Sequence, residues 1–204
     1  MGIRDEGRWF ESEVQRRGIT QICHFTRLGH LQSIKTYGLR SSRFLKSRNL
    51  PFYQNDSGRW DGLEDHICCS IQYPNGKLLE KWRRETESDE WLILFISPNI
   101  ICGRTAASVK YSATNAAWKR GSLKELGKGG FQKMFEQTVE TKWGPVNRSS
   151  NLPKFCTTDL QAEVLLNKPV PWEGITTVVA MNERVVQEIK QIDSGKRVLC
   201  DQRF

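Results

Sequence analysis

The sequence predicts a single α+β domain over residues 1–204. Amphipathic segments with helical spacing alternate with short apolar runs that are typical of strands. The 204 residues are 38% hydrophobic and 26% charged, which suits one compact domain with a real core. No repeat, low-complexity segment or linker divides the chain.

The N-terminal elements are predicted to be two helices that flank a strand. Residues 4–17 carry apolar side chains on a polar background, as an amphipathic helix does, and residues 19–25 have a strand pattern. A second helix is expected over residues 28–37, with Thr26 as its cap and Gly38 at its end.

Apolar runs bounded by turn residues continue this pattern in the rest of the chain. The run at 91–97 is apolar throughout, as expected for a buried strand. Asn182 is placed to cap the last helix. We predict strands at residues 67–73, 91–97, 162–166 and 175–181, helices at 113–120, 123–141 and 183–192, and loops at 41–65 and 142–158.

The charge of the chain indicates a polyanionic partner. The formal net charge is +8, and the cations concentrate in residues 27–59 and 141–158. Such zones favour nucleic acid or the pyrophosphate of a nucleotide. A solvated basic face without a partner is the alternative.

Neither a membrane segment nor a cysteine framework is expected. No apolar run approaches the roughly 18 residues of a membrane span, and the first residues resemble no signal peptide, so a cytoplasmic location is predicted. The six cysteines include no Cys-x-x-Cys pair, which predicts buried free thiols, with neither a zinc site nor disulfides.

Gln161 and Glu163 lie two residues apart at the mouth of the apolar run 158–166. In an extended strand, residues at this spacing project to the same face. Gln-x-Glu at a strand entrance resembles the signature of mono-ADP-ribosyltransferases. In those enzymes the Glu holds the nicotinamide ribose and the Gln meets the acceptor.

Four ordered blocks resemble the DarT family of DNA ADP-ribosyltransferase toxins, over residues 20–192. The first block is His24-Phe25-Thr26, followed by the predicted helix that ends at Gly38-Leu39. Segment 41–75 lacks the tyrosine- and phenylalanine-rich strand of the thymine-modifying branch and is closer to the guanine-modifying branch. The other three blocks are residues 68–75, 114–117 and 161–166.

The resemblance implies an ADP-ribosyltransferase-like fold, with central mixed or antiparallel β-sheets and flanking helices. It also implies transfer of ADP-ribose from NAD to a base of single-stranded DNA, with guanine favoured, release of nicotinamide and no metal. A cognate antitoxin that removes the ADP-ribose would accompany such a toxin in a toxin–antitoxin or phage-defence module.

Two residues are expected to carry the chemistry. The Glu163 carboxylate would stabilise the cation-like transition state and hold a ribose hydroxyl. The rigid fork of an arginine suits the pyrophosphate or the acceptor, and we choose Arg43 over Arg40 and Arg48. A solvated Glu at a strand edge is the alternative for Glu163.

His24, Thr26, Ser70 and Tyr73 are expected to bind NAD. His24 and Thr26 belong to the first block, and the resemblance places them against the ribose and the nicotinamide end. Ser70 and Tyr73 fall where the middle residue of a His-Tyr/Ser-Glu triad would be. Without the resemblance, a histidine beside a phenylalanine is more often a core residue.

Acceptor binding is assigned to Gln161 and to the predicted loop 142–158. The Gln161 amide can donate to and accept from a base. Trp143, Arg148 and Lys154 interleave an aromatic ring with cations, as single-stranded nucleic acid requires. The alternative is a basic surface loop that its tryptophan anchors to the core.

Two other functions remain open from the sequence. The chain could be a catalytically idle nucleic-acid-binding module on the same scaffold, although the presence of Glu163 and His24 argues against it. It could also be an ADP-ribosyltransferase that acts on RNA or protein.

Overall fold

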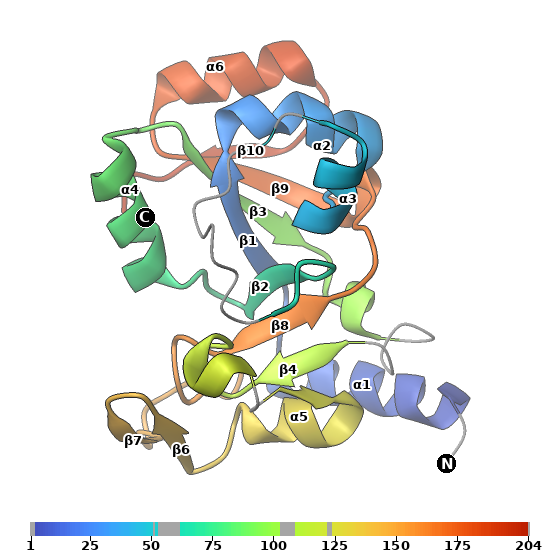
Figure 1. Ribbon diagram of the computed structural model, residues 1–204, viewed down its shortest axis with the longest axis vertical. Helices are drawn as coiled ribbons and strands as arrows, with labels where there is room; N and C mark the ends of the chain where they lie inside the picture. The colour runs from blue at the N-terminus through green and yellow to red at the C-terminus, as the bar shows by residue number, and fades with distance from the viewer. Residues whose placement is uncertain (1–2, 51, 53–61, 103–108, 122–123, 204) are drawn as a thin grey trace.

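The computed structural model describes residues 3–50, 52, 62–102, 109–121 and 124–203. Figure 1 shows a central sheet with helices around it. The sheet has eight strands in the order β10-β9-β3-β1-β2-β8-β4-β5, and only the β10–β9 pair is parallel among those described. Strands β6 and β7 form a separate two-stranded sheet. The predicted α+β fold with a mostly antiparallel sheet and flanking helices is confirmed.

The strands are β1 (Ile22–Arg27), β2 (Ile67–Ile71), β3 (Trp91–Ile96), β4 (Lys110–Ser112), β5 (Glu125–Leu126), β6 (Thr138–Thr141), β7 (Gly144–Asn147), β8 (Glu163–Leu166), β9 (Ile175–Ala180) and β10 (Val198–Cys200). The helices are α1 (Ile3–Arg17), α2 (Leu31–Tyr37), α3 (Ser42–Ser47), α4 (Gly76–Thr86), α5 (Gly127–Lys133) and α6 (Glu183–Ile192). Short 3₁₀ turns occupy Leu28–His30, Pro98–Ile101, Trp118–Gly121 and Trp172–Gly174.

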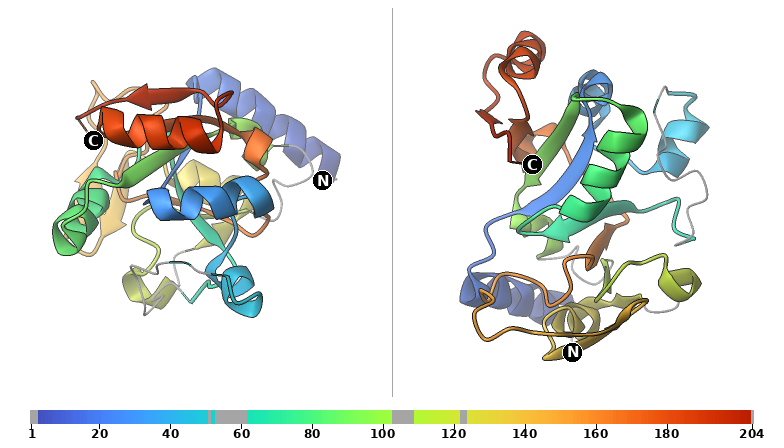
Figure 2. Two further views of the ribbon diagram at one scale, coloured as in Figure 1. Left: turned by 90° about the horizontal axis from the view of Figure 1, so that it is seen from above. Right: turned by 90° about the vertical axis from the view of Figure 1, so that its left-hand side faces the viewer.

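Aromatic side chains hold α1 and α5 against β4 at one end of the molecule (Figures 1 and 2). The rings of Phe10 in α1 and Tyr111 in β4 are stacked, with centroids 5.8 Å apart. Phe131 of α5 meets both rings edge-on, at 5.4 Å from each. Such offset and edge-to-face pairs add to the stabilisation from burial.

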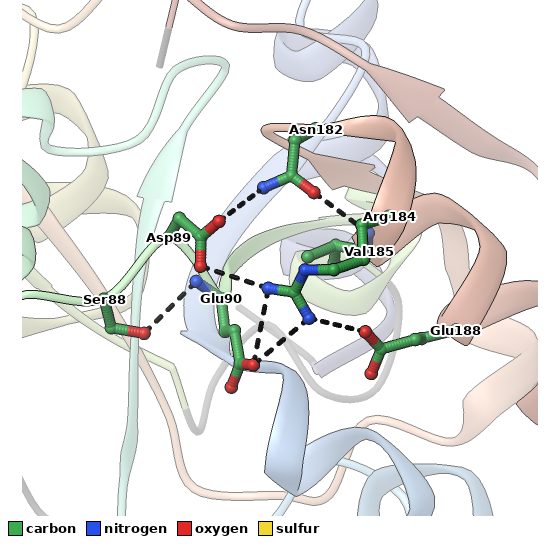
Figure 3. Close-up of polar contacts among 7 residues, drawn as sticks. All are labelled: Ser88, Asp89, Glu90, Asn182, Arg184, Val185 and Glu188. Carbon is green, nitrogen blue, oxygen red and sulfur yellow. Dashed lines mark hydrogen bonds and ion pairs between the residues drawn. The ribbon is translucent and has the colours of Figure 1, made fainter.

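Helix α6 begins at the predicted cap. Oδ1 of Asn182 accepts a hydrogen bond from the Val185 N–H over 3.0 Å. Arg184 forms ion pairs with Asp89, Glu90 and Glu188, so the start of α6 is tied to the segment that precedes β3 (Figure 3).

Gly38 ends α2 where no other residue would fit. Its φ is +76°, and a Cβ there would lie 2.7 Å from the carbonyl oxygen of Val170. That close approach allows the Leu39 N–H to donate to the same carbonyl over 2.8 Å. The end of α2 and the segment after β8 therefore lie side by side.

The predicted N-terminal boundaries need two corrections. Thr26 does not cap a helix: it lies inside β1, which runs from Ile22 to Arg27. The predicted loop 41–65 contains α3, whose first turn is capped by the Ser41 hydroxyl, and residues 51 and 53–61 lie outside the described part of the chain.

Residues 74–76 are turn formers that lead into α4. Oδ1 of Asn75 accepts from the Leu78 N–H over 3.1 Å, as an N-cap does. Only Leu79 is buried on this helix, and Glu80 pairs with Arg84 on its outer face. Its apolar residues keep a helical spacing, with Leu78 and Trp82 four residues apart and both on the cavity side, but no helix was predicted there.

The middle of the chain holds more strand and less helix than predicted. Segment 113–120 forms only the 3₁₀ turn Trp118–Gly121 among its described residues. Segment 123–141 divides into β5, the seven-residue helix α5 and β6. The predicted loop 142–158 contains β7, which pairs with β6.

The described residues bear on three expectations, which concern the cysteines, membrane-spanning helices and metal sites. All six cysteines are free, but the prediction that they are buried holds for four of them, because Cys68 is only partly buried and Cys200 is exposed. None of the helices in the described part of the chain is long and apolar enough to cross a bilayer. No group of three or more His, Cys, Asp or Glu among these residues is arranged to hold a metal ion.

Candidate active site

A cavity of about 450 Å³ lies where β1 and β2 separate. Strand β1 pairs with β3 along its whole length, from Ile22 to Arg27. Its pairing with β2 is limited to Ile22 with Ile71 and Cys23 with Ser70. The residues of β1 beyond Cys23 and those of β2 before Ser70 therefore line an opening in the middle of the sheet.

His24 bridges this opening. Its Nδ1 lies 2.8 Å from the carbonyl oxygen of Cys68. Because a carbonyl only accepts, Nδ1 carries the proton, and Nε2 carries the lone pair in the neutral ring. The interaction satisfies a β2 carbonyl at the point where pairing with β1 has ended.

Glu163 brings a carboxylate into the cavity from the opposite side of β2. It is the first residue of β8, which lies between β2 and β4, and its register partner in β4 is Ser112. Oε1 of Glu163 accepts the backbone N–H of Ala116 over 2.9 Å. A hydrogen bond from a fixed backbone donor orients a carboxylate before any ligand binds.

A second histidine lies beside Thr26 in the same cavity. The Thr26 hydroxyl is 2.9 Å from Nδ1 of His30. Burial lowers the pKa of His30 to about 4, and the nearby His24 and Arg27 add to the effect. The His30 ring is therefore neutral at physiological pH, next to a hydroxyl that it can orient.

The third histidine of the chain also lines the cavity. Nδ1 of His66 is 2.7 Å from the Asp65 carboxylate. Burial alone would raise the pKa of Asp65, but the hydrogen bond and charge of His66 lower it. All three histidines of the sequence thus gather around one opening.

Arg40, not Arg43, supplies the cavity with a guanidinium from the region of α3. Arg40 lines the cavity, its Nε donates to the Tyr37 carbonyl over 2.6 Å, and its guanidinium lies 4.5 Å from the centre of the Phe44 ring. Arg43 is exposed and does not line the cavity. Among the described residues, Arg27 of β1 and Lys81 of α4 are the other cations of the lining.

The structure brings four of the predicted site residues together. Glu163, His24, Thr26 and Ser70 all line the cavity. They come from β8, β1 and β2, so strand pairing alone places them near one another.

Two other predicted residues lie outside the cavity lining. Gln161 occupies a turn before β8, where its N–H donates to Oδ1 of Asp159 over 3.0 Å, so the strand argument that placed it on the same face as Glu163 was wrong. Tyr73 follows β2 and is exposed, with its ring 6.3 Å from that of Phe155.

The segment 142–158 is folded back on itself. Arg148 donates to the carbonyl oxygens of Cys156 and Pro153, over 2.8 and 2.7 Å, so its guanidinium holds this segment in shape. Trp143 is 82% exposed at the tip of the β6–β7 hairpin and does not anchor the loop to the core. Lys154 is exposed.

Sequence reasoning missed several cavity residues because long-range pairing places them. His30 lies within the first block, and Arg40, which was weighed against Arg43, follows that block directly, so their position was a signal that could have been used. His66 reaches the cavity only because β2 lies beside β1. Asn75, Lys81 and Asn115 also line it.

Comparison with protein families identifies a match over most of the chain. The model of the family described as "ssDNA thymidine ADP-ribosyltransferase, DarT" matches residues 23–201, which is nearly the whole chain. No curated protein sequence matches the chain.

Solved structures with this fold include DarT proteins from two organisms. Thermosipho africanus DarTG in complex with ADP-ribose has a TM-score of 0.61 and 13% identity, and the match covers 90% of this chain and 50% of that one. Thermus sp. 2.9 DarT in complex with NAD+ has a TM-score of 0.60 and 16% identity, over 90% and 96% of the two chains. The same Thermus protein in complex with ADP-ribosylated ssDNA has a TM-score of 0.59, 16% identity and coverage of 91% and 95%. This chain thus spans about half the length of the Thermosipho chain and nearly all of the Thermus one.

Proposed function

The chain belongs to the DarT family, and from this membership and the geometry of the cavity we propose that it transfers ADP-ribose from NAD to a base of single-stranded DNA. One observation carries the proposal: Glu163 is held by a backbone N–H in a cavity that also contains His24 and Thr26. A cavity of about 450 Å³ lies within the usual range of small-molecule sites.

In this reaction the bond between nicotinamide and its ribose breaks and a bond from the ribose carbon to a base nitrogen forms. Nicotinamide leaves with the bonding electron pair, which neutralises its ring, and the acceptor nitrogen loses a proton. Positive charge develops on the ribose in the transition state, so a pre-oriented carboxylate lowers the barrier. Glu163 is assigned this role.

The residues that line the cavity are the ones proposed to face NAD. His24, Thr26 and Ser70 offer polar atoms to the ribose and the nicotinamide end. Arg40 takes the role first given to Arg43, because it lines the cavity and a guanidinium matches the oxygens of a pyrophosphate. No metal is assigned a part.

The DNA is proposed to run past the β6–β7 hairpin. Trp143 offers an exposed ring for stacking, while Lys142 and Lys154 neutralise phosphates. The pair Tyr73 and Phe155 extends this aromatic surface toward the end of β2. Bases inside a duplex are inaccessible, which favours a single-stranded acceptor. Gln161 is kept as a candidate that reads the acceptor.

Guanine is the proposed acceptor base, on the resemblance of segment 41–75 to the guanine-modifying branch. The description of the matched family names thymidine, which is the competing assignment. Oligonucleotides that each lack one base, incubated with NAD and analysed by mass spectrometry, separate the two. Modification that disappears without guanine supports the proposal, and modification that disappears only without thymine overturns the base assignment.

The proposal extends to a toxin whose antitoxin removes the ADP-ribose. Expression of the chain in a bacterium should stop growth. A variant without Glu163 should not do so at equal protein levels. Normal growth with active enzyme present would contradict the toxin role and leave the chemistry standing.

Labelled NAD tests the proposed acceptor class. The label should enter single-stranded DNA, and enter RNA and protein far more slowly. DNA binding without transfer would instead support the idle nucleic-acid-binding module. Faster labelling of RNA or protein would overturn the choice of DNA.

A further inference from the structure

Asp159 is a buried carboxylate four residues before Glu163, and only 6% of its surface is exposed. Its Oδ2 accepts the Thr114 hydroxyl over 2.6 Å, and its Oδ1 accepts the Gln161 N–H over 3.0 Å. Its backbone carbonyl accepts the Ala162 N–H over 3.1 Å. A carboxylate taken out of water requires such bonds, so both oxygens hold defined positions.

Thr114 belongs to the segment that orients Glu163. It is 2% exposed and lies two residues before Ala116, whose N–H donates to Oε1 of Glu163 over 2.9 Å. Asp159 therefore fixes the turn that leads into Glu163 and, through Thr114, the turn that provides the donor to the Glu163 carboxylate.

We propose that Asp159 and Thr114 form a positioning pair that holds the Ala116 N–H against the Glu163 carboxylate. Neither residue lines the cavity, so the pair acts on the reacting centre through Ala116 and Glu163 and not through the cofactor. The catalytic role of this pair rests on the proposed transfer reaction. The hydrogen bonds that form the pair do not depend on that reaction.

The expected effect is on turnover, with cofactor affinity preserved. Displacement of a reacting group by about 1 Å can lower a rate by roughly 100-fold. Removing the bond between Thr114 and Asp159 is expected to lower kcat by about 10- to 100-fold. The dissociation constant for NAD should change by less than about 2-fold, because the groups that line the cavity remain.

Thr114→Val and Thr114→Ser test the pair. Valine has the shape of threonine without the hydroxyl, and serine keeps the hydroxyl. We expect Thr114→Val to lose kcat and Thr114→Ser to recover most of it. Asp159→Ala should lower kcat at least as much, because it also removes the acceptor of the Gln161 N–H. Adding Thr114→Val to it should cost little more, because the bond between Thr114 and Asp159 is already lost.

Thr157→Val is the matched control. The Thr157 hydroxyl is also buried and donates to Asp159, but to its backbone carbonyl, over 2.8 Å. Thr157→Val therefore removes a buried hydrogen bond from the same cluster without cutting the link to the Ala116 turn. It should lower Tm about as much as Thr114→Val and lower kcat far less.

Amide hydrogen exchange of Ala116 gives a readout that does not depend on activity. Its protection should fall in Thr114→Val and remain in Thr157→Val. Unchanged protection and kcat in Thr114→Val would overturn the positioning pair, as would an equal loss of kcat in the two valine variants. A wild-type protein without any transfer would contradict the proposed function, and the exchange of Ala116 would still decide whether the pair holds the donor.

Discussion

Nδ1 of His24 donates a hydrogen bond to the carbonyl oxygen of Cys68, across the gap where β1 and β2 stop pairing. The ring replaces a strand–strand hydrogen bond and, in its neutral form, presents Nε2 as an acceptor. His24 therefore has a structural task and a proposed cofactor-binding task, and one substitution to alanine would remove both.

Asparagine separates the two tasks of His24. Its Nδ2 is as many bonds from Cα as the Nδ1 of histidine, so it can donate to the Cys68 carbonyl, but it has no counterpart of Nε2. We expect His24→Asn to keep Tm close to wild type and to weaken NAD binding in calorimetric titration. His24→Ala should lower both. Wild-type affinity for NAD in His24→Asn would leave His24 with the structural task alone.

Arg40 and Arg43 provide a matched pair of arginines three residues apart. Arg40→Ala should raise KM for NAD about 10-fold or more, since charge-assisted hydrogen bonds to phosphate are worth roughly 1.5–3 kcal/mol. Arg43→Ala should be near wild type because Arg43 does not line the cavity. Steady-state kinetics at fixed DNA concentration measure both. An effect of Arg43→Ala as large as that of Arg40→Ala would restore Arg43 as the functional arginine.

His30 makes stability depend on pH. The pKa of folded His30 is about 4, below the ordinary histidine value of 6.5, because burial disfavours the charged ring. Between these values the unfolded chain binds a proton that the folded chain does not, so stability falls as pH decreases from about 6.5 to about 4. Chemical denaturation from pH 7 to 5 should show a smaller loss for His30→Asn, which cannot titrate. Parallel curves for the two proteins would contradict the pKa shift.

Lys142, Trp143 and Lys154 are predicted to form the DNA-binding surface, without Arg148. Each phosphate contact contributes about 0.7 to the slope of log affinity against log salt for single strands, so Lys142→Ala with Lys154→Ala should lower that slope by about 1.4. Trp143→Ala should cost about 1–3 kcal/mol of DNA affinity through lost stacking. Fluorescence anisotropy with labelled oligonucleotides measures both quantities.

Substitutions of Arg184 and Arg148 are the control variants, because neither arginine belongs to the proposed DNA-binding surface. Arg184 already pairs with three carboxylates, so Arg184→Ala should leave the salt slope unchanged (Figure 3). Arg148→Ala should lower Tm, because Arg148 holds the carbonyl oxygens of its own segment. Affinity that does not depend on salt would contradict a phosphate-binding role for the two lysines.

The sequence predicted the elements whose signals are local and strong. β3 and β9 are apolar runs that the core requires, and the Asn182 cap marks the start of α6. His24, Thr26 and Glu163, which were predicted from short motifs, all line the cavity.

Other features depend on contacts that one segment cannot reveal. Thr138–Thr141 alternates between exposed and buried positions, as a strand does, but it follows α5 closely and was merged with it into one helix. The choice between Arg40 and Arg43 required knowledge of α3, and the place of His66 required the pairing of β2 with β1. The buried contacts of Asp159 likewise join segments that are 45 residues apart.

The Glu163 carboxylate is proposed to carry the transfer of ADP-ribose to DNA. The most direct measurement is the intact mass of a single-stranded oligonucleotide containing all four bases, after incubation with NAD and either wild-type protein or Glu163→Gln. Glutamine keeps an oxygen that can accept the Ala116 N–H but lacks the negative charge. We predict that wild-type protein adds one ADP-ribose and that Glu163→Gln is at least about 100-fold slower, with an unchanged Tm and NAD still bound. Transfer by folded Glu163→Gln at the wild-type rate would contradict the account.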